Sequence, residues 1–247
     1  MANARNIALL DPLKILLYGP AGTKKTTLAA TFPNPHFVDF DNGMRTVKGK
    51  DISYVTITNR ETTDEDFLAI PECKKVAKAS AFVKGQKYAE YLANTLTETD
   101  TLVIDSLTFW GNYAMDHTLA LVGRTGQPPQ IQDWGTARKL IEITLEALKS
   151  ARCNLIIITH EDFEKDAEQG FISFIPKGVT GNQGRILPAF FDEVWRAGIE
   201  HGQGVDKGKL TYQITTVAGK RSEGKSRSNL PPIIIDPTYE KIKSLIK

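Results

Sequence analysis

The sequence predicts an α/β protein with a mostly parallel central sheet, helices on both faces and added strands near the C-terminus. Three observations predict this class. Apolar runs rich in β-branched residues alternate with longer segments of helical spacing. Two of the runs, 101–104 and 154–159, are apolar almost throughout, which is typical of strands covered on both faces. The runs at 209–217 and 231–235, both beyond residue 197, indicate further strands.

The predicted elements follow one another along most of the chain. Each strand is a short run of Leu, Ile, Val or Phe, and each helix repeats apolar residues at three- or four-residue spacing. The predicted strands are 13–18, 36–40, 52–57, 101–104 and 154–159, and the predicted helical segments are 26–31, 86–97, 140–148 and 238–247. Residues 123–135 and 161–188 show neither period and are predicted to be loops.

The composition predicts a soluble, cytoplasmic protein. The 247 residues are 41% hydrophobic and 24% charged, unlike a disordered or fibrous chain. A net charge of +2 excludes nucleic-acid binding by bulk charge alone but permits a local basic groove. Cys73 and Cys153 are expected to be free thiols, and no apolar run is long enough to span a membrane. We expect a single domain over 1–247, with its core at about 13–200 and C-terminal strands and a terminal helix at about 207–247.

The strongest motif is LLYGPAGTKKTTLA at residues 16–29, in which a strand, a glycine-rich turn and a helix start follow in order. Counting from Gly19, Lys25 and Thr26 occupy the last two positions of G-x-x-x-x-G-K-[ST], the phosphate-binding loop. Backbone amides of such a loop cradle a polyphosphate, its Lys bridges the terminal phosphates, and its hydroxyl binds Mg²⁺. The residues predicted to bind nucleotide are Gly19, Pro20, Ala21, Gly22, Thr23, Lys24, Lys25, Thr26 and Thr27.

One residue departs from this motif, because Lys24 stands where the second glycine belongs. A side chain there resists the backbone conformation that glycine permits, at a cost of about 1 kcal/mol or more. The alternative is a glycine-rich turn without a ligand. The coincidence of strand, turn, lysine and two hydroxyls favours nucleotide binding, while the rate of hydrolysis stays open.

A phosphate loop needs a partner strand that ends in an acid to orient Mg²⁺, and Asp105 supplies this acid at the end of the buried run TLVI. In ring ATPases of the AAA+ type a catalytic Glu follows this Asp directly, whereas Ser106 follows here. The general base must then come from elsewhere, and Asp41, at the end of the second strand, is the candidate. The alternative is that Asp41 caps a turn before Gly43.

Three further polar residues are candidates for contact with the terminal phosphate. His160 ends the run at 154–159 and would sense that phosphate, or would only cap a carbonyl. Lys225 and Arg227 point the same way on an extended segment. They would stabilise the transferring phosphate of a neighbouring subunit, or would belong to a solvated basic turn.

Together these residues resemble the RecA-type ATPase core and, more narrowly, the phage-encoded RecA-like nucleotide-binding proteins of single-strand annealing and recombination. The resemblance runs from residue 13 to about 230. Asp41 stands where RecA proteins usually carry Glu, and Lys24 where they carry Gly. The matching segments are YGPAGTKKTTLA, VDFDNG, TLVIDSLT, DWG at 133–135, LIIITHE, FFDEVWR at 190–196 and GKSRSNL at 224–230.

The resemblance implies ATP and Mg²⁺ as cofactors, a homo-oligomeric ring or filament with nucleotide at subunit interfaces, and location in the cytoplasm of a phage's host. It also implies a single-stranded DNA partner held by the two predicted loops, and contact with a single-strand-binding protein. The residues that would touch DNA are Arg124, Phe171, Phe174, Lys177 and Arg185. The acidic first half of the second loop, which includes Glu161 and Glu164, opposes such contact.

Two other functions stay open. In one, the protein is a nucleotide-binding module with little or no hydrolysis, and the nucleotide stabilises an oligomer. In the other, it is a motor or loader acting on duplex DNA or on a protein partner.

Overall fold

A nine-stranded sheet forms the centre of this computed structural model, which describes residues 12–165, 172–202 and 208–246. The strand order is β11-β9-β8-β1-β5-β4-β2-β3, with β10 paired to β8. The strands are β1 Lys14–Tyr18, β2 Pro35–Asp39, β3 Ser53–Thr56, β4 Thr101–Asp105, β5 Asn154–Thr159, β8 Glu193–His201, β9 Leu210–Thr215, β10 Lys225–Ser226 and β11 Ile233–Ile235. From β3 to β8 the neighbours are parallel, and β9, β10 and β11 pair antiparallel. The mostly parallel sheet and the added C-terminal strands are confirmed.

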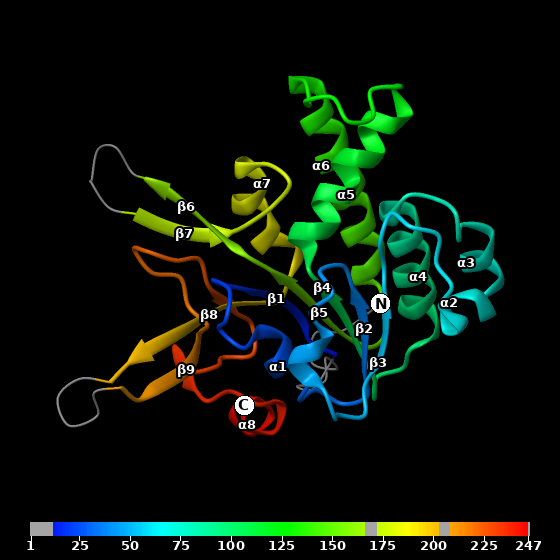
Figure 1. The fold of residues 1–247 in the computed structure, drawn as a ribbon. Helices are drawn as coiled ribbons and strands as arrows, with labels where there is room; N and C mark the ends of the chain where they lie inside the picture. Colours follow the sequence, from blue (N-terminus) through cyan, green and yellow to red (C-terminus); the bar gives the residue numbers. More distant parts are fainter. Residues whose placement is uncertain (1–11, 166–171, 203–207, 247) are drawn as a thin grey trace, which may run out of the picture.

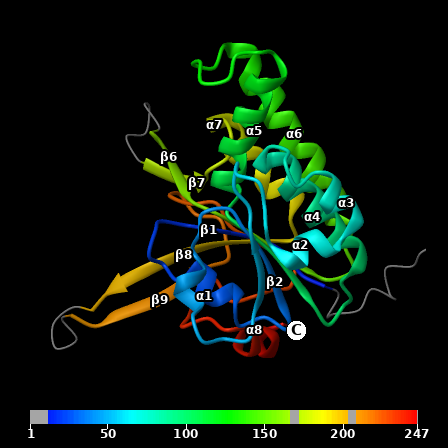
Figure 2. The same cartoon turned by 45° about the vertical axis from the view of Figure 1, so that its right-hand side comes forward.

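Helices cover both faces of the sheet, as predicted (Figures 1 and 2). One face is covered by α4, α5 and α6, and the other by α1 and α8. The helices are α1 Lys25–Ala29, α2 Glu65–Ala69, α3 Pro71–Lys75, α4 Ala81–Thr95, α5 Leu107–Leu121, α6 Ile131–Lys149, α7 Gly181–Ile186 and α8 Tyr239–Leu245, with 3₁₀ turns η2 Met44–Val47 and η3 Leu187–Phe190. This division follows from the sequence of the strands, in which consecutive apolar residues serve opposite faces.

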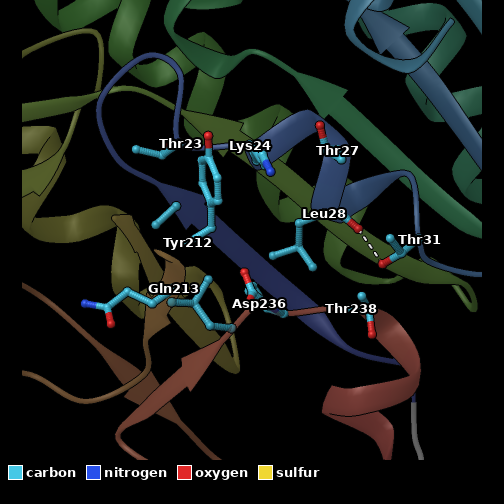
Figure 3. Close-up of a pocket in the computed structure, with 12 residues that line it drawn as sticks. Thr23, Lys24, Thr27, Leu28, Thr31, Tyr212, Gln213, Asp236 and Thr238 are labelled. Carbon is cyan, nitrogen blue, oxygen red and sulfur yellow. Dashed lines mark hydrogen bonds between the residues drawn. The ribbon is translucent and has the colours of Figure 1, made fainter. Parts of the chain in front are cut away.

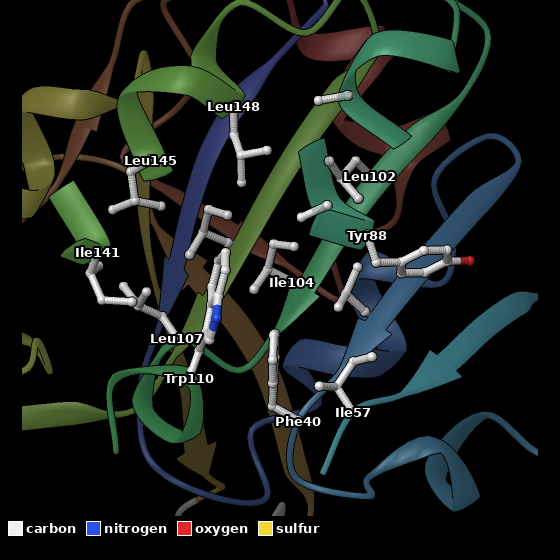
Figure 4. Packing of buried hydrophobic residues seen from close by; sticks show 14 of the residues in the cluster. Phe40, Ile57, Tyr88, Leu102, Ile104, Leu107, Trp110, Ile141, Leu145 and Leu148 are labelled. Atoms are coloured by element: carbon white, nitrogen blue, oxygen red, sulfur yellow. The ribbon is translucent and has the colours of Figure 1, made fainter. Parts of the chain in front are cut away.

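The core fixes the segment that follows β2. Trp110 of α5 stacks on Phe40, with ring centroids 5.0 Å apart (Figure 4). Gly85 of α4 makes room for this pair, because a Cβ there would lie 2.4 Å from the Phe40 ring. Phe40 is therefore held in the core, and the next residue, Asp41, is carried at the edge of the sheet.

The two segments predicted to be loops contain regular structure instead. Residues 161–188 include the hairpin strands β6 (Glu161–Lys165) and β7 (Ile172–Pro176), followed by α7 and the start of η3. The pairing places Phe163 opposite Phe174, a cross-strand contact that no short sequence window reveals. In the first segment α6 begins at Ile131, because Asp133 and Gln130 form a capping box. Residues 123–130 are a loop as predicted, whereas the loop prediction was wrong for 131–135 and for most of the described part of 161–188, because capping and cross-strand contacts leave no hydrophobic period.

Strands β1, β2, β4 and β5 end at one edge of the sheet. The registers place Tyr18 beside Thr159, and Asp105 beside both Ile158 and Asp39. Strand β5, which ends before His160, lies between β1 and β4. The segments that leave these four strands therefore converge at the same edge.

Two predictions from composition can also be compared with the structure. Cys73 and Cys153 are both free and buried. Within the described ranges, no helix has the length and apolar character needed to cross a membrane. The single-domain boundary stays a prediction.

Candidate nucleotide-binding site

The glycine-rich turn joins β1 to α1 at the converging edge. Gly19 has φ 150° and lies so close to β8 that a Cβ would be 2.4 Å from the carbonyl oxygen of Ala197. Gly22 adopts φ 80°, which a side chain resists. Close packing against β8 therefore requires glycine at position 19, and the backbone conformation favours it at position 22.

Lys25 and Thr26 connect this turn to the neighbouring groups. The Lys25 ammonium, which is buried, donates to the carbonyl oxygens of Gly19 at 2.9 Å and Pro20 at 2.8 Å. Burial lowers the pKa of Lys25, and the nearby Asp105 opposes that shift. The Thr26 hydroxyl donates to Asp105 Oδ2 at 2.7 Å. The predicted magnesium pair, Thr26 and Asp105, is thus brought together by direct contact.

Two carboxyl groups of the site have raised pKa values. Burial raises the pKa of Asp105 to about 7, with the charges of Asp41 and Asp39 adding to the shift and the Thr26 hydroxyl opposing it. Burial also raises the pKa of Asp41 to about 6, with Asp39 as the next cause. Carboxylates held apart from water and beside one another are poised to accept a cation.

The turn after β2 is capped by Asp39. Asp39 Oδ1 accepts the backbone N–H groups of Asp41 at 3.3 Å and Gly43 at 3.2 Å, and Oδ2 accepts the Thr56 hydroxyl at 2.9 Å. Asp41 Oδ1 is buried and has no hydrogen-bond partner in the described part of the chain. Asp41 is therefore available for a ligand, as its predicted role as general base requires.

His160 follows β5 at the same edge. Its backbone N–H donates to the Thr108 hydroxyl at 3.1 Å, and its ring meets Phe109 edge-on at 6.2 Å between centroids. Burial lowers the pKa of His160, and the nearby charges of Lys25 and Lys177 lower it further. The imidazole is thus held neutral, able to donate one hydrogen bond to a phosphate oxygen.

One cavity of about 250 Å³ brings these groups together. Gly43, Thr46 and Ser106 also line it, and the sequence had not assigned Thr46 a role. Thr46 carries no recognisable motif, so only its place in η2, beside the Asp41 turn, reveals it. The predicted site residues that line the cavity are Ala21, Gly22, Thr23, Lys24, Lys25, Thr26, Asp41, Asp105 and His160.

The donor set fits Mg²⁺. A hydroxyl and a carboxylate oxygen in contact are hard ligands of the kind that Mg²⁺ takes, and the unpartnered Asp41 oxygen adds a third acceptor nearby. The described residues contain no cluster of three or more Asp, Glu, His or Cys side chains suited to a metal. Thr26 and Asp105 would therefore hold the ion together with phosphate oxygens and water.

Lys24 adopts the left-handed conformation, with φ 60° and ψ 29°, at the position before α1. Its ammonium lies 3.6 Å from the centroid of the Tyr212 ring in β9. Lys24 therefore keeps the backbone that glycine would supply, and its side chain extends toward β9. The contact with Tyr212 links distant parts of the sequence and could not be predicted from it.

Lys225 and Arg227 lie outside the cavity. The Lys225 ammonium donates to the carbonyl oxygens of Phe191 at 2.5 Å and Pro188 at 3.3 Å. Arg227 pairs with Asp192, whose backbone N–H bonds to Lys14 at the start of β1, whereas the phosphate loop follows its end. Neither residue contributes to the site of its own chain, and their action on a neighbouring subunit stays a prediction.

The residues predicted to touch DNA are not brought into one group. Arg124 pairs with Asp133 near the connection of α5 to α6, which projects from the molecule (Figure 1). Arg185 pairs with Glu164, and Phe174 lies under the Arg196 guanidinium at 4.5 Å. Lys177 is exposed, and Phe171 lies outside the described residues. Of these cations only Lys177 has a charge without an acidic partner in the described ranges.

Comparison with known proteins adds the following. A protein-family model described as an AAA domain matches residues 11–228. Among solved structures, a KaiC-like protein of Pyrococcus horikoshii OT3 is similar, with 14% identity, a TM-score of 0.48, and 91% of this chain and 90% of that chain covered. An ATPase from the type III secretion system of pathogenic bacteria is also similar, with 14% identity and a TM-score of 0.42. The match covers 77% of this chain and 55% of that chain, so this chain spans little more than half of the ATPase's length. No curated protein matches in sequence.

Proposed function

Because the chain belongs to the AAA-domain family of P-loop NTPases, we propose that it binds ATP with Mg²⁺ and hydrolyses it. The observation that carries this proposal is the single cavity shared by Lys25, Thr26, Asp105, Asp41 and His160. Four separate strands deliver these residues to one edge of the sheet. A lysine for the phosphates, a hydroxyl and a carboxyl for Mg²⁺ and a second carboxyl for water are the parts that P-loop NTPases use in phosphoryl transfer.

Each side chain has a role that follows from its placement. Lys25 would exchange its two carbonyl contacts for the β- and γ-phosphate oxygens, and the loop amides would hold the same phosphates. Mg²⁺, held by Thr26 and Asp105, would neutralise charge on the phosphates. Asp41, with a pKa of about 6, is largely ionised above neutral pH and can orient and deprotonate a water. His160 would donate to the terminal phosphate.

The first experiment is phosphate release from ATP by the purified protein, with Mg²⁺ and with EDTA. We expect turnover with Mg²⁺ only. If ATP binds with Mg²⁺ and no phosphate is released, the alternative of a binding module whose nucleotide stabilises an oligomer replaces the proposed hydrolysis. If neither ATP nor its analogues bind, the proposal fails as a whole.

We further propose that the nucleotide cycle is coupled to single-stranded DNA in annealing or recombination, in a phage context and as a homo-oligomer. The sequence resemblance supports this, and so does the direct succession of His160 and the β6–β7 hairpin. A phosphate contact that moves His160 would also move the next residue, Glu161, which begins the hairpin and pairs with Arg196 at 3.0 Å. The hairpin also carries Phe174.

A basic surface next to the phosphate cavity also supports a nucleic-acid partner. Arg45, Lys48 and Lys50 line a cavity of about 420 Å³ together with Tyr54, whose side chain is half exposed. The three cations are exposed and make no ion pair with any described residue. An unpaired basic groove beside an exposed aromatic ring suits a single strand, in which phosphates and unstacked bases are both accessible.

The test is ATP turnover and oligonucleotide binding with single- and double-stranded DNA at low and moderate salt. We expect single strands to stimulate turnover, and Lys48→Glu to weaken binding more than Arg185→Glu, because Glu164 already neutralises Arg185. Equal response to duplex DNA would favour a motor or loader. No response to either DNA would leave a protein partner as the alternative.

A further inference from the structure

A second cavity, of about 190 Å³, lies along α1, where Thr27, Leu28 and Thr31 line it (Figure 3). Thr23 and Lys24 border both cavities, so the two are neighbours along the phosphate loop. The outer wall of the second cavity is formed by β9 and by residues 236–238 near the C-terminus. No residue of that wall belongs to the motifs recognised in the sequence.

The order of residues along α1 relates the two cavities. Lys25 and Thr26 face the acidic cavity, whereas Thr27 faces the second one. A nucleoside triphosphate with its terminal phosphates at Lys25 would extend along the loop past Thr27. Its nucleoside would then enter the second cavity.

The lining of this cavity has the chemistry of a base-binding site. Its walls include the apolar side chains of Leu28, Ile214 and Pro237, and apolar surface predominates over polar surface. Tyr212 supplies an aromatic face, and the exposed Asp236 supplies a carboxylate at the rim. Aromatic stacking with a few polar groups at the edge is how proteins hold planar heterocycles.

The Lys24 ammonium identifies the ligand-accessible face of the tyrosine. It lies 3.6 Å from the ring centroid, about the separation of stacked planar groups, and this contact is made by a flexible side chain. A base that stacks on Tyr212 would take this place. The ammonium would then be free to donate to a ring nitrogen or carbonyl of the base.

The walls are held in place without a ligand. The backbone N–H of Asp236 donates to the carbonyl oxygen of Tyr212 at 2.7 Å, and the backbone N–H of Tyr239 donates to the Thr31 hydroxyl at 2.9 Å. These bonds tie the C-terminal segment to β9 and to α1. The cavity is therefore preformed, which reduces the entropic cost of binding.

We propose that this cavity is the purine subsite of the nucleotide site, an inference that rests on the proposed function. Tyr212 stacks on the base, Asp236 accepts a hydrogen bond from a ring or exocyclic N–H, and Lys24 donates to the base edge. A purine offers a larger stacking surface than a pyrimidine and both kinds of edge group. The residue that departs from the phosphate-loop motif thus acts in base recognition.

The test compares binding of ATP, GTP, CTP, UTP and inorganic tripolyphosphate, each with Mg²⁺, to the wild type, Tyr212→Ala and Tyr212→Phe. We expect purine triphosphates to bind the wild type more tightly than pyrimidine triphosphates and tripolyphosphate. Tyr212→Ala should weaken purine binding by about 5- to 100-fold and leave tripolyphosphate binding unchanged. Tyr212→Phe should retain purine binding, because it retains the stacking face. The ATP-to-GTP ratio reports which purine fits.

Three results would overturn the subsite. In the first, Tyr212→Ala binds purine triphosphates as tightly as the wild type does. In the second, Tyr212→Ala loses as much affinity for tripolyphosphate as for purine triphosphates. In the third, the wild type binds tripolyphosphate as tightly as ATP. The second result would mean that Tyr212 only supports the loop. If tripolyphosphate and all four nucleotides fail to bind the wild type, the proposed function itself is wrong, and the subsite falls with it.

Discussion

The cavities on the two sides of the phosphate loop differ in chemistry although adjacent residues line them. The inner cavity holds the ionisable groups Asp41, Asp105 and His160 around Lys25. The outer one is mainly apolar, and there Lys24 lies over the ring of Tyr212. Both lysines border the inner cavity, but their ammonium groups make different contacts, because that of Lys25 bonds to the loop carbonyls and that of Lys24 lies over Tyr212. The presence of two adjacent lysines does not by itself tell which of them binds phosphate.

The largest effect is expected from removing the lysine of the inner cavity. Lys25→Ala should weaken both ATP and tripolyphosphate binding by about 100-fold or more, because the only buried cation of the described site is lost. Titration calorimetry with both ligands measures this. Lys24→Gly is the matched control and should keep tripolyphosphate affinity within about threefold. Equal losses in the two variants would refute the division of roles between the lysines.

A large effect on turnover, with little on binding, is expected from the unpartnered acid. Asp41→Asn should lower kcat by about 100- to 1000-fold and change ATP affinity by less than about threefold, because the amide cannot accept the proton of water. Single-turnover phosphate release, with separately measured ATP binding, gives both quantities. If Asp41→Asn turns over ATP like the wild type, another residue is the base.

The pH dependence of kcat/KM should reveal the crowded acids of the inner cavity. The pKa values of Asp41, about 6, and Asp105, about 7, are raised, so protonation of these groups should lower kcat/KM as the pH falls from 7.5 to 5.5. Asp39→Asn should move the acidic limb to lower pH, because the Asp39 carboxylate helps to raise the pKa of Asp41. A profile that is flat down to pH 5 would exclude Asp41 as the base.

The smallest effect is expected on stability, from the lysine of the outer cavity. Lys24→Gly removes the strain of a left-handed lysine, which stabilises the fold by about 1 kcal/mol. It also loses the Tyr212 contact and raises the conformational entropy of the unfolded chain, and these two losses together destabilise the fold by about the same amount. The free energy of unfolding should therefore change by less than about 1 kcal/mol, measured by urea denaturation. A destabilisation above about 2 kcal/mol would show that the main role of the Lys24–Tyr212 contact is to stabilise the fold.

The sequence by itself determined the parts of the fold and the site that depend on neighbouring residues. The parallel strands follow from apolar runs such as 154–159, and the phosphate loop from the spacing of Gly19, Lys25 and Thr26. Asp105 follows because it ends a buried strand. These features are local, since a period of two or of 3.6 residues and a fixed motif spacing are written in one short segment.

Only the tertiary structure decided the features that join distant segments. It assigned the turn cap to Asp39 and left Asp41 Oδ1 without a hydrogen-bond partner, and it paired Arg185 with Glu164. It also placed Tyr212 beside Lys24, and formed the β6–β7 hairpin in a segment without period. The physical reason is that hydrogen bonds, ion pairs and ring contacts depend on distance in space, which the order of residues does not fix.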